Sequence, residues 1–142
     1  MRTGLYRLAQ WLWGLPQTLA GAVLAFYYRR CPHFSYRGTR VTIWSKPGSL
    51  SLGMFLFLSR SLPGVTGKTV AGYGELVLRH EFGHTLQSLI LGPLFLPVIG
   101  LPSLTWAGSK KLAALRAKKH ISYYSLDPER WANRLGKVPE LR

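Results

Sequence analysis

The sequence predicts an α+β fold, and two kinds of segment indicate it. Residues 39–44 and 50–58 are rich in β-branched or apolar side chains, which is typical of strands, and the two segments can pair as a hairpin. Residues 75–91 and 128–135 carry helical patterns with recognisable ends. A chain of 142 residues is long enough for one such domain and short for two.

The first predicted element is an apolar helical stretch at residues 5–30. Gly14 and Pro16 are expected to break or kink it, because proline cannot donate a backbone hydrogen bond inside a helix. We therefore divide the chain into an N-terminal apolar, membrane-associating helical segment at 1–30 and an α+β domain at 31–142.

The ends of the two later helices are marked by residues that favour helix boundaries. Gly92 and Pro93 close the first of them. Asp127 is a good N-cap for the second, Pro128 suits its first position, and Gly136 suits the residue just past its end. These residues make the second helix the most sharply bounded element of the sequence.

The remaining segments are predicted from their glycine, proline and lysine content. Residues 31–38 and 59–74 are expected to be loops. Three prolines interrupt a second apolar stretch at residues 86–106, so we expect it to form short pieces. Residues 110–119 are predicted to form a short basic helix.

The composition excludes several classes of protein. Nineteen lysines and arginines against five acidic residues give a net charge of +14, while 47% of the residues are hydrophobic. That apolar content argues against a disordered basic tail. The single cysteine, Cys31, excludes both an internal disulfide scaffold and a four-cysteine zinc site.

The charge balance favours an anionic partner. Two nearly uncharged stretches, 8–28 and 86–106, contain or adjoin aromatic residues, so we expect association with an anionic membrane surface, with the basic segments on the cytoplasmic side. Two alternatives stay open: both stretches form a soluble core, or Arg2 and Arg7 begin a secretory signal. Nucleic acid is not expected as a partner, because the sequence has no zinc-finger, helix-turn-helix or aromatic RNA-binding signature.

A candidate metal site lies in the predicted helix at 75–91. The sequence His80-Glu81-Phe82-Gly83-His84 is an H-E-x-x-H pattern. Because four residues make just over one helical turn, His80 and His84 project from the same face and can bind one zinc ion. Glu81 is then placed beside the metal, where it can accept a proton from water.

Zinc held by two histidines needs a third protein ligand. The longer pattern H-E-x-x-H-x-x-G-x-x-H is excluded, because Gln87 and Ile90 stand where it needs glycine and histidine. Three candidates remain. Glu129 is favoured, His120 is the second choice, and Asp127 is better explained as a helix cap.

The case for Glu129 comes from its own helix. Asn133 follows Glu129 by four residues, so the two side chains share one helical face. A ligand carboxylate and a polar side chain one turn later suit a metal site, because the second residue can hold a histidine ligand through its other ring nitrogen.

Together these two motifs resemble those of the gluzincin zinc metallopeptidases, most closely the membrane-associated members with an E-x-x-A-D-R-L-G type second helix. The resemblance covers the H-E-x-x-H segment and residues 129–136. It implies a zincin-like domain, in which a small sheet lies over the active-site helix and an edge strand, here within 50–58, binds the substrate backbone. Asn133 stands where the family usually has aspartate, and it brings no negative charge.

We therefore expect a small membrane-associated zinc metallopeptidase that cleaves a peptide or protein substrate. One zinc ion per chain is expected to be held by His80, His84 and Glu129, with Glu81 as general base and then general acid.

A donor for the transition-state oxyanion is sought just before Glu129. Tyr123, Tyr124 and His120 are the candidates. The alternative function is a non-catalytic, zinc-stabilised, cationic membrane-binding protein, which is a degenerate metallopeptidase. The short chain and the uncharged Asn133 favour it.

Overall fold

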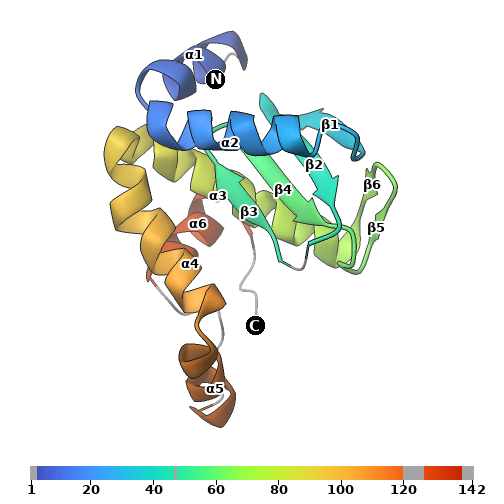
Figure 1. Ribbon diagram of the computed structural model, residues 1–142, viewed down its shortest axis with the longest axis vertical. Coiled ribbons are helices and arrows are strands. Elements are labelled where there is room, and N and C mark those ends of the chain that lie inside the picture. The colour runs from blue at the N-terminus through green and yellow to red at the C-terminus, as the bar shows by residue number, and fades with distance from the viewer. Residues whose placement is uncertain (1–2, 47, 120–126, 139–142) are drawn as a thin grey trace.

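The computed structural model describes residues 3–46, 48–119 and 127–138, and it combines helices with a small sheet. Figure 1 shows the arrangement in layers. Helix α2 crosses one face of the sheet, the long helix α3 lies behind the other face, and α6 lies beside α3. The segment that contains α4 and α5 extends away from this body.

The main sheet has four strands in the order β1-β2-β4-β3. They are β1 (His33–Tyr36), β2 (Thr39–Trp44), β3 (Leu50–Leu52) and β4 (Phe55–Ser59). Strand β2 pairs with β4 in parallel, whereas β1 pairs with β2 and β3 with β4 antiparallel. The predicted hairpin between 39–44 and 50–58 is therefore wrong.

The predicted strand at 50–58 is in fact two strands joined by a tight turn. Gly53 makes the turn with a φ of +61°, and a Cβ there would lie 2.1 Å from Thr18 Oγ1 of α2. Only glycine fits such a position. Because the chain reverses here, β3 becomes an edge strand and β4 an interior one, so only β3 keeps the edge position expected within 50–58.

The two segments predicted as loops both contain short strands. β1 begins at His33, inside the first of them. The second contains a two-stranded hairpin of β5 (Val65–Thr66) and β6 (Thr69–Val70). These strands were not predicted because each is stabilised by pairing with another strand. The composition of a short segment does not indicate such pairing.

The N-terminal stretch forms two helices, α1 (Thr3–Leu12) and α2 (Leu15–Tyr27). The predicted break is confirmed: helix α1 ends before Gly14, and Pro16 lies in the first turn of α2. Across the described ranges, no helix combines the length and apolar character needed to cross a bilayer.

The core lies on both faces of the sheet. Val41 and Leu56 are among the strand residues that pack against Val77 and Leu78 of α3 (Gly72–Leu91). The alternate strand residues, including Phe57, form the second core cluster with Ala25 of α2 and Phe82 of α3. The alternation of side chains along each strand thus divides them between two clusters, one on each face of the sheet.

The chain continues from α3 through short helical pieces to α6. These are a 3₁₀ turn η1 (Gly92–Leu94), a π-helical turn η2 (Leu96–Gly100), α4 (Leu101–Gly108), the basic helix α5 (Lys110–Lys119) and α6 (Asp127–Leu135). The predictions of short pieces, of the basic helix at 110–119 and of the helix at 128–135 are confirmed. The left-handed residue after α6 is Lys137 rather than Gly136.

Candidate metal centre

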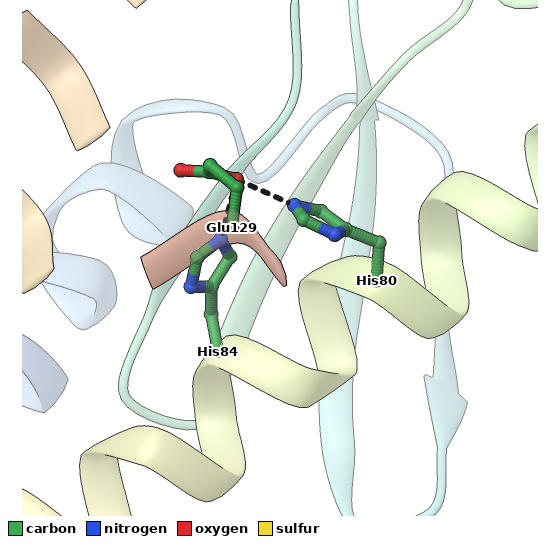
Figure 2. A group of neighbouring side chains, drawn as sticks. All are labelled: His80, His84 and Glu129. Carbon is green, nitrogen blue, oxygen red and sulfur yellow. Dashed lines mark hydrogen bonds and ion pairs between the residues drawn. The ribbon is translucent and has the colours of Figure 1, made fainter. Parts of the chain in front are cut away.

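Helices α3 and α6 bring together the three residues that can hold a metal ion. Figure 2 shows the imidazoles of His80 and His84 on one side of α3, with Glu129 facing them from α6. Potential ligand atoms of these three residues all lie within 4.8 Å of one another. In the part of the chain that the structure describes, this is the one such group.

The ring nitrogens of both histidines face defined partners. His80 Nε2 lies 2.8 Å from Glu129 Oε2, and His84 Nε2 lies 3.2 Å from the same oxygen. The other nitrogen, Nδ1, lies 2.6 Å from Asn133 Oδ1 in His80 and 2.6 Å from Gln87 Oε1 in His84. An amide oxygen only accepts, so each Nδ1 carries the hydrogen and donates it.

This hydrogen-bond pattern fixes what the centre can bind. With hydrogen on Nδ1, the neutral rings of His80 and His84 each present a lone pair at Nε2. Both lone pairs point toward a carboxylate oxygen of Glu129, which also carries lone pairs. Three electron-pair donors this close repel one another unless a cation, either a proton or a metal ion, lies among them.

The ionisation and burial of the Glu129 carboxyl favour the binding of such a cation. Burial raises the pKa of this carboxyl. When a proton is the cation and His80 and His84 carry it, their hydrogen bonds and charges outweigh burial and hold the pKa well below its usual range. Its second oxygen, Oε1, is buried and has no hydrogen-bond partner among the described residues. Glu129 is thus an ionised, fully buried carboxylate whose Oε1 is available to bind a cation.

The two helices approach closely because glycine lies at the points of contact. A Cβ at Gly83 of α3 would lie 1.9 Å from the backbone oxygen of Ala132 in α6. A Cβ at Gly136 would lie 2.0 Å from the backbone oxygen of Arg79 in α3. Any larger residue at either position would push α6 outward and carry Glu129 away from the histidines.

Glu81, the remaining polar residue of the motif, is also buried on α3. Burial raises the pKa of its carboxyl to about 7; the charge of His80 opposes this rise and that of Glu129 adds to it. A carboxyl with a pKa near neutrality can both accept and return a proton at physiological pH.

The structure brings together most of the residues that the sequence singled out. His80, His84, Glu129 and Asn133 meet in one cluster, with the buried Glu81 on the same helix. The candidates His120, Tyr123 and Tyr124 lie outside the described residues, as does the side chain of Asp127.

Sequence analysis missed one member of the cluster, Gln87. Its position three residues after His84 places both on one helical face, and this spacing was the available signal. Glutamine is not among the usual zinc ligands, so a pattern of metal ligands does not predict it.

A scan against models of protein families and searches of curated proteins and of solved structures find no match to this chain.

Proposed function

We propose that this protein is a zinc-dependent hydrolase of peptide bonds, with the metal held by His80, His84 and Glu129. The observation that carries the proposal is the convergence of two histidine Nε2 atoms on a carboxylate oxygen, while both Nδ1 atoms are occupied by amide oxygens. Two nitrogens and one oxygen form a donor set that suits zinc and leaves a fourth position for water or substrate.

When bound, zinc polarises a carbonyl and makes water a stronger nucleophile at neutral pH. The chain's own contribution is to orient the ligands and to move a proton. Asn133 and Gln87 fix the ring orientations of the two histidines. Glu81 accepts a proton from the attacking water and returns it to the leaving nitrogen, a role that its raised pKa supports.

The second candidate function is a zinc site without catalysis. Two observations favour it. The ligands are almost fully enclosed, since His80, His84 and Glu129 are only 2%, 6% and 0% exposed, whereas a catalytic zinc keeps an accessible position. In addition, Nδ1 of each histidine faces the oxygen of a neutral amide rather than a carboxylate.

Glu81→Gln distinguishes the two functions. In the catalytic case, the zinc-loaded wild type cleaves members of a fluorogenic peptide library, and the variant keeps its zinc but loses at least about 100-fold in kcat. Glu75→Gln is the matched control, because Glu75 is an exposed carboxylate on the same helix. Unchanged turnover in Glu81→Gln would refute the proposed mechanism.

For the non-catalytic function, we expect zinc binding without hydrolysis. The wild type then binds zinc and unfolds at a higher temperature with zinc than without it. Neither the wild type nor Glu81→Gln cleaves any peptide in the library, and the variant binds as much zinc as the wild type does.

A further inference from the structure

Helix α2 buries polar side chains and exposes most of its large apolar ones. The side that packs on the protein carries Gln17 and Thr18, both 0% exposed. The outer side carries Leu19, Val23 and Phe26, which are 53%, 65% and 70% exposed. In water, the hydrophobic effect favours the opposite arrangement.

Helix α1 shows a similar distribution, although it also buries Tyr6. Gln10 is 0% exposed, while Leu5, Leu8 and Leu12 are 62%, 54% and 73% exposed. The exposed residues of each helix recur every three or four positions, so each helix presents a continuous apolar stripe. Ten of the sixteen large apolar side chains that are well exposed within the described ranges belong to α1, α2 and the turn between them.

The buried polar side chains show that this orientation is specified. Gln10 Nε2 donates to the backbone oxygen of Thr85 at 2.9 Å, and Ser88 Oγ donates to Gln10 Oε1 at 2.8 Å. Gln17 Nε2 lies 2.7 Å from Ser88 Oγ and 2.9 Å from the backbone oxygen of Gly92. Turning the helices over would break these bonds and bury unpaired amides.

The charged residues in the sequence of α1, α2 and the segment up to Gly74 are all basic. No aspartate or glutamate occurs before Glu75, so no carboxylate of the N-terminal half offsets its arginines. Arg29 lies over the ring of Phe26, 4.5 Å from the ring centroid, and Arg30 follows it. In Figure 1, α1 and α2 lie together on one outer side of the molecule.

We propose that the outer surface of α1 and α2 inserts into the headgroup and upper acyl region of an anionic lipid bilayer. Exposed leucines, Val23 and Phe26 enter the apolar layer, and the neighbouring arginines meet anionic headgroups. A second copy of the chain suits this surface less well, because it would bring the same uncompensated arginines together. This proposal is independent of the metal centre.

Flotation of the purified full chain with lipid vesicles tests the proposal. We expect the wild type to float with vesicles of phosphatidylcholine mixed with phosphatidylglycerol. Leu19→Ser/Val23→Ser/Phe26→Ser should bind these vesicles at least about 100-fold more weakly, since it removes three inserted side chains. The matched control is Tyr73→Ser/Leu115→Ser, which changes two exposed apolar residues outside α1 and α2 and should bind as the wild type does.

The anionic component is tested separately with Arg29→Gln/Arg30→Gln. This variant should bind the mixed vesicles about tenfold or more weakly and bind pure phosphatidylcholine vesicles as the wild type does. Failure of the wild type to float, equal binding to both vesicle types, or wild-type binding by the triple serine variant would each overturn the proposal.

Should the triple variant fail to fold, brominated lipids provide a readout in the wild type alone. Trp11 and Trp13 lie in α1 and the turn that follows it, and insertion should let brominated acyl chains quench their fluorescence. An absence of quenching, or a dimer that replaces vesicle binding in analytical ultracentrifugation, would overturn the proposal.

Discussion

Two helix pairs of this protein bury polar side chains, and they do so with different outcomes. In the pair α3–α6, His80, His84 and Glu129 point their electron pairs toward a common position. In the pair α1–α2, Gln10 and Gln17 instead donate to oxygens of α3 and of Gly92.

This contrast between the two helix pairs shows how a buried polar residue can be interpreted. Donors matched to acceptors hold two parts of the protein together and need nothing further. Acceptors that face acceptors require a cation from outside, so they indicate a binding site. Substitutions that affect one helix pair and leave the other unchanged therefore test this comparison.

The largest expected effect on stability is at the contact between α3 and α6. Gly83→Ala places a Cβ against the backbone oxygen of Ala132, so we expect a loss of about 3 kcal/mol in the free energy of unfolding. Urea denaturation measures it. The matched control is Gly4→Ala in α1, where a Cβ meets nothing within 4 Å, and we expect a gain of about 0.5–1 kcal/mol. Equal effects at the two glycines would contradict the account.

The next effect concerns the residues that orient the histidines. Asn133→Leu and Gln87→Leu each remove the acceptor of one Nδ1–H, so each should weaken zinc binding about 10- to 100-fold. Competition with a chelator of known affinity measures the change. Asn133→Asp, which adds a negative charge beside Nδ1 of His80, should strengthen binding instead. Wild-type affinity in both leucine variants would show that the amides do not act on the metal.

A smaller effect is expected in the α1–α2 pair. Gln10→Leu removes the donor to the backbone oxygen of Thr85 and the acceptor of the Ser88 hydroxyl hydrogen, which should cost about 2 kcal/mol of unfolding free energy. Zinc affinity should not change, because Gln10 does not contact the metal centre. A loss of zinc affinity comparable to that of Asn133→Leu would remove the distinction between the two helix pairs.

The smallest effect is a pH dependence from Tyr6 of α1. Burial raises the pKa of its phenol from 10.0 to about 12, and the nearby Thr85 and Gln10 offset only part of this rise. Its contribution to stability is therefore complete below pH 10 and is lost as the pH rises toward 12, because the unfolded chain ionises first. Between pH 9 and 11, the free energy of unfolding should therefore fall by about 1 kcal/mol more in the wild type than in Tyr6→Phe. Identical declines in wild type and variant would contradict the raised pKa.

Local patterns predicted the parts of the fold and of the site that depend on neighbouring residues. The spacing of His80 and His84 on one helix face, and of Glu129 and Asn133 on another, follows from helical geometry alone. The break at Gly14 and the boundaries of α6 followed from glycine and proline chemistry in the same way.

Contacts between distant segments were not predictable from these patterns. The parallel pairing of β2 with β4 depends on the turn at residue 53, where the close approach of Thr18 of α2 requires glycine. The buried positions of Gln10 and Gln17 depend on acceptors more than seventy residues away. The neighbouring residues in the sequence give no indication of these distant contacts.

Zinc content of the purified protein is the most direct test of a metal centre between α3 and α6. Mass spectrometry of metals should find about one zinc per chain in the wild type. Glu129→Gln, which replaces the carboxylate that both histidines face, should lose the zinc while the α1–α2 control Gln10→Leu keeps it. Wild-type protein without zinc after growth with zinc present, or full zinc content in Glu129→Gln, would contradict a metal centre formed by α3 and α6.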